Sequence, residues 1–262
     1  MTIKDKFIQL RDSGKKAFIA YVPFGYPEPS ATKGIILSLI SGGADVIELG
    51  LPFSDPLADG PIIQKATHRA LCAGANLNNL FVTLSQLRRH LTVPLVIMTY
   101  YNPVFKFGMS DFLAKIKRFG VSGIMVVDLP IEESRLYLEQ TGRLSLEPVF
   151  FVTPTTSERR AEKIVQRSKG FIYYISVTGT TGFRRLSYVF LRKHIAYLKK
   201  ITELPVCVGF GVHTASQVAR INSFSDGVVV GSAIVKFIEE NYRRSLFYRR
   251  LADYIKLLKG TP

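Results

Sequence analysis

The sequence has 262 residues, 47% of them hydrophobic, and its 35 Lys and Arg residues outnumber 20 Asp and Glu residues to give a formal net charge of +15. This length and hydrophobic content suit one large α/β domain or two small ones. The apolar runs are too short for a membrane span, and residues 1–16 lack the apolar run and cleavage site of a signal peptide. Together with only two cysteines, these features predict a cytoplasmic protein without a disulfide framework.

The strong positive charge is compatible with nucleic acid, a membrane surface or small anions as partners. Most of the basic residues are paired inside segments with a helical pattern, which favours solvated outer helix faces. No nucleic-acid-binding motif accompanies them, so we expect neither nucleic acid nor membrane as a partner. The four histidines and two cysteines show no metal-ligand spacing, and we expect no metal site.

Hydrophobic patterning predicts an alternation of helices and strands along the whole chain. The first helix is expected over residues 4–13. Ser30 is the expected N-cap of the second helix, and Pro61 is expected in the first turn of the third. Residues 101–103 are expected to form a loop. The expected strands cover residues 18–22, 45–49, 94–100, 123–128, 148–152, 171–176, 205–209 and 227–231. The remaining helices are expected over residues 31–40, 62–74, 80–91, 109–119, 132–144, 157–168, 189–202, 214–221, 232–242 and 246–258.

The eight strands are mostly apolar at every position, as parallel strands covered on both faces should be. Eight strand–helix units in about 250 residues are typical of a (β/α)8 barrel. We therefore predict an α/β fold, a single TIM barrel over residues 1–262 with an extra N-terminal helix. An open doubly wound sheet is the alternative, but no GxGxxG motif follows the first strand.

Acidic residues mark one stretch, residues 45–61. Glu48 lies near the carboxyl end of an apolar strand, where a carboxylate is costly without a partner or a task, and Asp55 and Asp59 follow in the loop. A strand end with an Asx-type turn would explain the pattern equally well. In a barrel, however, Glu48 and Asp59 meet the strand-end residues Tyr100 and Asp128 on the catalytic rim, which favours acid–base chemistry, while Asp55 is expected to shape the loop.

Glycine-rich turns follow the last three strands, at residues 177–182, 209–211 and 231–233. Loops of this kind let backbone N–H groups approach an anion, and Ser232 is expected at a helix N-terminus. Tight turns alone would also explain any one of them. Together with the two carboxylates they predict an enzyme that acts on a small phosphorylated substrate.

The motif from Glu48 to Pro61 resembles the signature of the tryptophan synthase α subunit family. Supporting matches lie at residues 100–103, 128–134, 181–182, 209–211 and 231–236. The resemblance implies a lyase of L-tryptophan biosynthesis that cleaves indole-3-glycerol phosphate to indole and glyceraldehyde 3-phosphate by a retro-aldol reaction. By the same match Glu48 protonates indole C3 and helps to remove the glycerol hydroxyl proton, and Asp59 interacts with the indole N–H and steadies the positive charge on the ring.

The resemblance also assigns binding roles. It implies that Thr181 takes part in loop closure and that the substrate phosphate binds at Gly182, Gly211, Gly231 and Ser232. The implied indole pocket consists of Tyr21, Ile63, Tyr100, Met125 and Tyr173. The family works as an αββα heterotetramer in which the β subunit carries pyridoxal phosphate, so no cofactor is expected in this chain.

Two segments beside the site depart from the family pattern, residues 23–27 after the first strand and Thr180 in the sixth loop. They motivate an alternative, in which the chain is a catalytically weak α subunit that mainly activates its β partner. The basic, aromatic segment 242–254 is not assigned a function by the motifs or by the resemblance.

Overall fold

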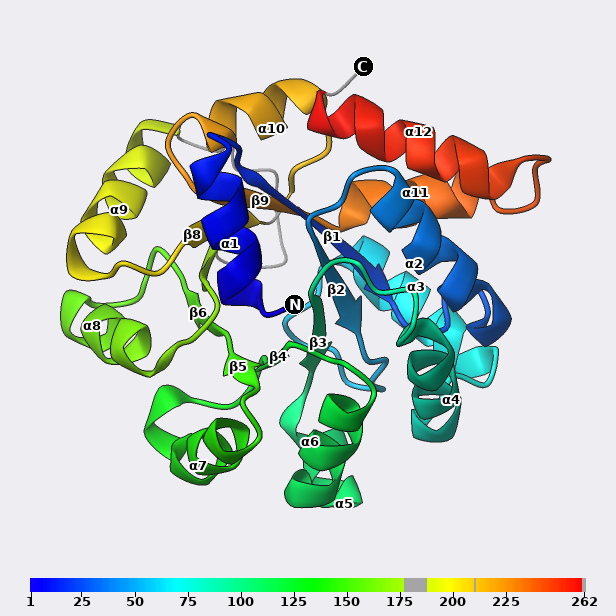
Figure 1. The fold of residues 1–262 in the computed structure, drawn as a ribbon, viewed down its shortest axis with the longest axis horizontal. Coiled ribbons are helices and arrows are strands. Elements are labelled where there is room, and N and C mark those ends of the chain that lie inside the picture. Colours follow the sequence, from blue (N-terminus) through cyan, green and yellow to red (C-terminus); the bar gives the residue numbers. More distant parts are fainter. Residues whose placement is uncertain (177–187, 210, 261–262) are drawn as a thin grey trace.

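The computed structural model describes residues 1–176, 188–209 and 211–260, and its strands form one parallel sheet that curls into a barrel (Figure 1). The strand order is β5-β4-β3-β2-β1-β9-β8-β7-β6. The strands are β1 Ala17–Pro23, β2 Val46–Gly50, β3 Leu95–Thr99, β4 Gly123–Val126, β5 Glu147–Pro148, β6 Phe150–Val152, β7 Ile172–Ile175, β8 Val206–Gly209 and β9 Gly227–Val230. The predicted (β/α)8 barrel is therefore confirmed.

The fifth predicted strand is divided in the structure into β5 and β6, which only Val149 separates. Its first half pairs with β4 and its second half with β7, so the break lies where the sheet closes on itself. The Val149 N–H still donates to the Ile124 carbonyl at 3.0 Å, which keeps the barrel continuous through the break.

Helices surround the sheet and connect its strands, as Figure 1 shows. Short 3₁₀ turns lie at Pro29–Ala31 and Ile131–Glu133. The α-helices are α1 Ile3–Asp12, α2 Thr32–Ser41, α3 Pro61–Cys72, α4 Leu77–Leu87, α5 Tyr101–Phe107, α6 Met109–Arg118, α7 Arg135–Arg143, α8 Glu158–Arg167, α9 Tyr188–Ile201, α10 Ala215–Asn222, α11 Ser232–Asn241 and α12 Phe247–Lys259.

Two local predictions were wrong. Ser30 does not cap α2, because Pro29 opens a 3₁₀ turn one residue earlier, and the Ser30 hydroxyl instead donates to Glu28 at 2.7 Å. The expected loop at residues 101–103 is the first turn of α5. Pro103 is tolerated there because the first N–H groups of a helix have no intrahelical partner to lose.

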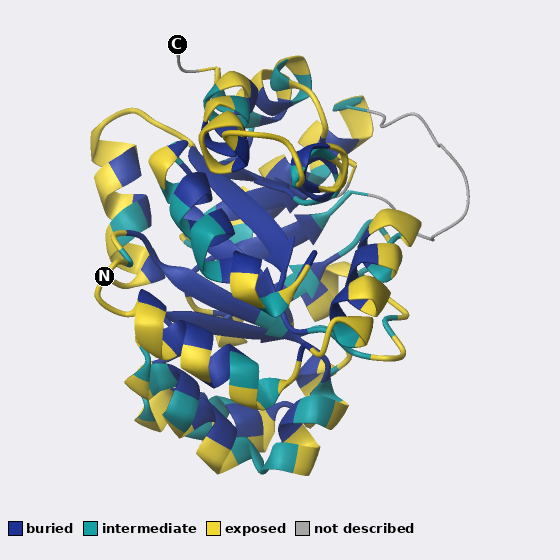
Figure 2. Cartoon of the chain, turned by 90° about the vertical axis from the view of Figure 1, so that its right-hand side faces the viewer, coloured by how far each residue is buried: buried dark blue, intermediate teal, exposed yellow. Residues whose placement is uncertain are grey.

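The burial pattern agrees with strands covered on both faces. β1, β2, β4, β8 and β9 are buried at every position. Figure 2 shows this buried centre surrounded by helices whose outer faces are exposed. None of the helices in the described ranges is long and apolar enough to span a membrane.

The amino-terminal end of the barrel is closed by α1, which confirms the extra N-terminal helix. The N–H groups of Ile3 and Lys4 donate to the Glu147 carboxylate at 2.6 and 3.1 Å, and the ring of Phe7 packs 5.9 Å from that of Phe171. The first N–H groups of a helix favour such a carboxylate because they carry partial positive charge.

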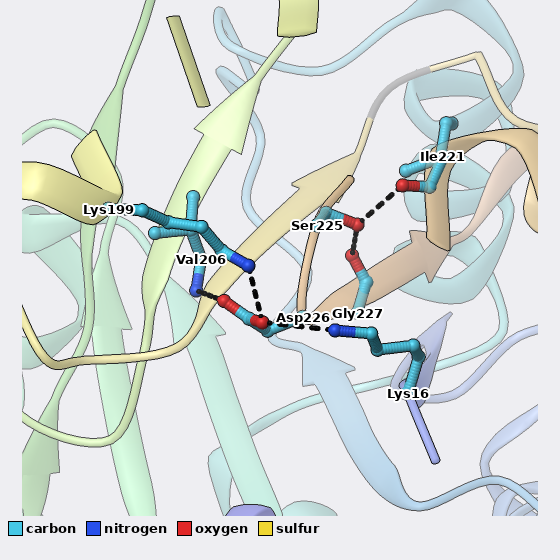
Figure 3. Close-up of polar contacts among 7 residues, drawn as sticks. All are labelled: Lys16, Lys199, Val206, Ile221, Ser225, Asp226 and Gly227. Atoms are coloured by element: carbon cyan, nitrogen blue, oxygen red, sulfur yellow. Dashed lines mark hydrogen bonds and ion pairs between the residues drawn. The ribbon is translucent and has the colours of Figure 1, made fainter. Parts of the chain in front are cut away.

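A second group of polar contacts at this end is centred on Asp226, just before β9 (Figure 3). Its carboxylate accepts from Lys16 at 3.3 Å, from Lys199 at 2.7 Å and from the Val206 N–H at 3.0 Å. These contacts join the starts of β1, β8 and β9 to α9. The amino-terminal end thus consists of contacts that hold the strands together, and the opposite end carries the loops in which barrel chemistry is normally found.

Candidate active site

A cavity of about 210 Å³ opens at the carboxyl ends of the strands. Glu48 and Asp59 both line it, so the structure brings together the two acids that the sequence singled out. A larger hollow of about 930 Å³ lies at the amino-terminal end beside α1, among residues that precede the strands. We take the smaller cavity as the candidate active site because it contains the paired acids and lies on the catalytic end of the barrel.

Glu48 reaches the cavity from β2, where it pairs in register with Tyr21 of β1 and Val96 of β3. Its side chain is buried, and its Oε2 atom has no hydrogen-bond partner among the described residues. Burial, and next the negative charge of Asp59, raise the pKa of Glu48 to about 8. Because loss of water penalises the charged form, Glu48 is a neutral acid at pH 7 and can donate a proton.

Asp59 lies on the loop between β2 and α3 and is buried although Ser54, Asp55, Leu57 and Ala58 of the same loop are exposed. Burial raises its pKa to about 6, while a hydrogen bond from Tyr100 acts in the opposite direction. At neutral pH the site therefore holds one protonated and one ionised carboxyl group. Two acids with separated pKa values can serve as proton donor and as charge stabiliser.

Two buried tyrosines flank Glu48 in the cavity wall, Tyr21 of β1 and Tyr173 of β7. Each needs a glycine on the next strand, because a Cβ atom at Gly50 would collide with the Tyr21 hydroxyl and one at Gly209 with the Tyr173 hydroxyl. Burial raises the pKa of both phenols well above the ordinary value. The two hydroxyl groups therefore stay protonated beside the acids.

The part of the cavity wall that follows β8 and β9 has the features expected of an anion site. Gly211, Gly231 and Ser232 all line it. Ser232 is the first residue of α11, and Gly231 at the N-cap has no side chain to occupy the N–H groups of that first turn. Gly211 has φ 75°, a left-handed backbone conformation that glycine adopts readily. The remaining predicted residues, Thr181 and Gly182, lie outside the described residues, as does Thr180.

The predicted indole pocket is only partly in contact with the cavity. Ile63 lines it together with Tyr21 and Tyr173. Met125 is fully buried in β4, and Tyr100 lies under the loop that carries Asp59, so neither is among the lining residues.

Sequence reasoning missed six large apolar lining residues: Ile62, Met98, Val127, Phe151, Ile175 and Val229. The two-residue period of a strand could have identified Ile175, because it lies on the same face of β7 as Tyr173. The Phe151 ring, 5.1 Å from that of Tyr173, could not have been placed without the sheet register.

Asp55 and Asp128 lie outside the cavity wall. Asp55 is exposed and accepts from the Ser54 hydroxyl at 2.5 Å, in keeping with a loop-shaping role. None of residues 23–27 lines the cavity, although Tyr21, two residues earlier on β1, does. Phe24 and Tyr26 are buried, so this departure changes the packing beside the site rather than its wall.

Within the described ranges, no group of three or more His, Cys, Asp or Glu side chains could hold a metal ion.

Comparison with known proteins identifies a family. Residues 7–254 match the family model "Tryptophan synthase alpha chain". The tryptophan synthase alpha chain of Geotalea uraniireducens is 40% identical over 258 residues, 98% of this chain and 96% of the relative. That of Carboxydothermus hydrogenoformans is 44% identical over 236 residues, 90% of this chain and 88% of the relative.

Solved structures agree with the sequence relatives. The tryptophan synthase alpha subunit of Legionella pneumophila superposes with a TM-score of 0.91 at 31% identity, covering 99% of this chain and 98% of that one. A chain of the aminoacrylate-bound tryptophan synthase of M. tuberculosis gives a TM-score of 0.88 at 30% identity, with 99% of both chains covered.

Proposed function

Because this chain belongs to the tryptophan synthase alpha chain family, we propose that Glu48 and Asp59 perform the retro-aldol cleavage of indole-3-glycerol phosphate to indole and glyceraldehyde 3-phosphate. The chain is thus a lyase of tryptophan biosynthesis. The observation that carries the proposal is the pair of buried acids in one cavity, with the pKa of Glu48 raised to about 8 and that of Asp59 to about 6.

The protonation states suit the reaction. Neutral Glu48 donates its proton to indole C3, and the ionised Asp59 accepts a hydrogen bond from the indole N–H as the ring becomes positively charged. The bond between indole C3 and the glycerol chain then breaks, and its electron pair returns to the ring. Glu48, now ionised, takes the proton of the glycerol hydroxyl as that carbon becomes the aldehyde, so no net proton is consumed.

Binding of the substrate phosphate is proposed at Gly211, Gly231 and Ser232, on the side of the cavity where the first turn of α11 offers free N–H groups. Thr181 and Gly182 are proposed to complete and close this site on the strength of the family match. The indole ring is proposed to lie against Tyr21, Ile63 and Tyr173, with Tyr100 and Met125 behind the wall.

A β subunit is proposed as the partner, in an αββα assembly in which the β subunit holds pyridoxal phosphate. The supporting observation in this chain is a set of exposed apolar side chains at the carboxyl end of the barrel. Leu57, beside Asp59, is 85% exposed and Phe105 of α5 is 65% exposed. Exposed apolar side chains near a site mark a surface that another protein can cover.

A cytoplasmic location is proposed because Cys72 and Cys207 are both free thiols.

Release of indole from indole-3-glycerol phosphate, with and without a β subunit, tests the proposal. We expect Glu48→Gln to lower kcat by about 10²-fold or more, since positioned proton transfer contributes about 10²–10⁴-fold. Glu147→Gln is the matched control, because Glu147 is a partly buried carboxylate that holds α1 at the opposite end of the barrel. Turnover near the wild-type level in Glu48→Gln would overturn the proposal.

The activator alternative is not favoured by the comparisons, because the chain matches an enzyme family over nearly its whole length. The same assay decides it. Substantial turnover of the wild-type complex, lost in Glu48→Gln, excludes a chain that only activates its partner.

A further inference from the structure

Tyr100 lies beneath the loop that carries Asp59 rather than in the cavity wall, and it is 4% exposed. Its ring packs 5.2 Å from that of Phe53, near the start of the loop. Its hydroxyl accepts from the Ala58 N–H at 3.1 Å, and the same hydroxyl interacts with the neighbouring Asp59 carboxylate strongly enough to lower the pKa of that acid. One side chain therefore contacts the loop at both ends.

The backbone at Tyr100 is held in place by β3, by α5 and by a contact with the end of β4. It directly follows β3 and is the N-cap of α5. The next N–H group along the chain, that of Tyr101, donates to the Asp128 carboxylate at 2.6 Å, which ties the end of β3 to the end of β4. Residues Ser54–Asp55 and Leu57–Ala58 of the loop are exposed, and the loop has two internal hydrogen bonds, from the Leu57 N–H to the Asp55 carbonyl at 2.9 Å and from the Asp59 N–H to the Pro56 carbonyl at 3.0 Å. A further contact comes from Gln64 of α3, whose side-chain amide donates to the Asp59 carbonyl at 2.9 Å.

We propose that Tyr100 is the positioning residue for Asp59: its hydroxyl fixes the loop backbone at Ala58 and directs the Asp59 carboxylate into the cavity. The inference rests on the proposed function, since it assigns a role in the same reaction. Tyr100 does not touch the reacting atoms in this assignment. It acts through Asp59, which must be both ionised and correctly placed when the indole ring becomes positively charged.

The electrostatics agree with the geometry. Burial raises the pKa of Asp59, and the hydrogen bond from Tyr100 lowers it, because that bond favours the ionised carboxylate. Burial also raises the pKa of Tyr100 itself, so its hydroxyl keeps its proton and remains a donor throughout the working pH range. Removal of the hydroxyl should therefore shift the Asp59 pKa upward and leave more of the carboxyl group protonated at pH 7.

Tyr100→Phe is the test variant, because it keeps the ring against Phe53 and removes only the hydroxyl. We expect kcat for indole release at pH 7 to fall about tenfold, the effect of about 1.4 kcal/mol, with KM changed less. We also expect the acid limb of the pH profile of kcat/KM to move to higher pH by about half a unit or more. Tyr137→Phe is the matched control, because its buried hydroxyl donates to the Ile124 carbonyl at 2.8 Å, away from the cavity.

A merely structural role would lower stability in both variants and leave the acid limb in place, and an unmoved acid limb in Tyr100→Phe would overturn the inference. NMR titration of the Asp59 carboxyl carbon without substrate gives an independent measurement, with the same upward shift expected. A wild-type chain that does not cleave the substrate would refute the proposed function, whereas the NMR shift would still decide the role of Tyr100. Normal cleavage with an unchanged Asp59 titration would refute only the role of Tyr100.

Discussion

Replacement of Glu48 by glutamine should stabilise the fold at alkaline pH while it removes activity. The folded-state pKa of Glu48 is about 8, against 4.5 for an unperturbed glutamic acid. The folded state therefore holds this proton more tightly than the unfolded state does, so stability is highest at low pH and is lost as the pH rises from 4.5 through 8. Glutamine does not ionise and escapes this loss.

The size of the effect follows from the pKa shift. The three pH units between pH 5 and pH 8, at about 1.36 kcal/mol each, make about 4 kcal/mol in the free energy of unfolding. The structural origin of this energy is a carboxyl group that is 1% exposed and has an unpartnered Oε2 atom. Any fixed cost of packing the glutamine amide is the same at both pH values, so it cancels when the two measurements are compared.

Urea unfolding followed by circular dichroism at pH 5 and pH 8.5 measures the effect. We expect the free energy of unfolding of Glu48→Gln, relative to the wild type, to increase by several kcal/mol between the two pH values. Glu139→Gln, on α7, is the matched control, because it makes the same chemical change at a carboxylate that is half-exposed to water. An equal difference at both pH values in Glu48→Gln would refute the reasoning, because it would show that burial does not penalise the charged form.

Three further changes test other parts of the structure. Asp59→Asn removes the charge that steadies the indole ring, and we expect kcat/KM for indole release to fall by about 10²-fold or more, with the acid limb near pH 6 lost from its pH profile. Gly50→Ala brings a Cβ atom against the Tyr21 hydroxyl, and we expect thermal unfolding to show a loss of about 1–3 kcal/mol together with slower turnover. Lys259→Met breaks the 2.8 Å ion pair with Asp45 at the amino-terminal end, and we expect urea unfolding to show a loss of about 1–3 kcal/mol with normal turnover.

Each of these has an outcome that contradicts it. An acid limb that persists unchanged in Asp59→Asn would show that another group titrates near pH 6. Normal stability and turnover in Gly50→Ala would mean that the Tyr21 ring can move aside without cost. A loss of turnover in Lys259→Met, at a temperature where the variant is folded, would show that the amino-terminal end of the barrel influences the catalytic end.

The acids illustrate what could be predicted about the site. Glu48 and Asp59 were identified from a charged residue on an apolar strand and an acidic loop, because burial of a carboxylate is costly enough to be informative without any structure. That Tyr100 lies beneath Asp59 and not in the cavity wall was beyond such reasoning. Its place depends on how the loop after β2 folds over the end of β3, which involves contacts between residues 42 and more positions apart.

The sequence by itself determined the barrel, because strands buried on both faces must be apolar at every position and that pattern can be counted along the chain. It also determined which residues stand at the strand ends. Only the tertiary structure decided where the fifth strand divides at Val149, which apolar side chains form the cavity wall, and how far the pKa values of Glu48 and Asp59 separate. These properties depend on the distance between strands remote in sequence and on the exclusion of water between them, and local patterning carries no information about either.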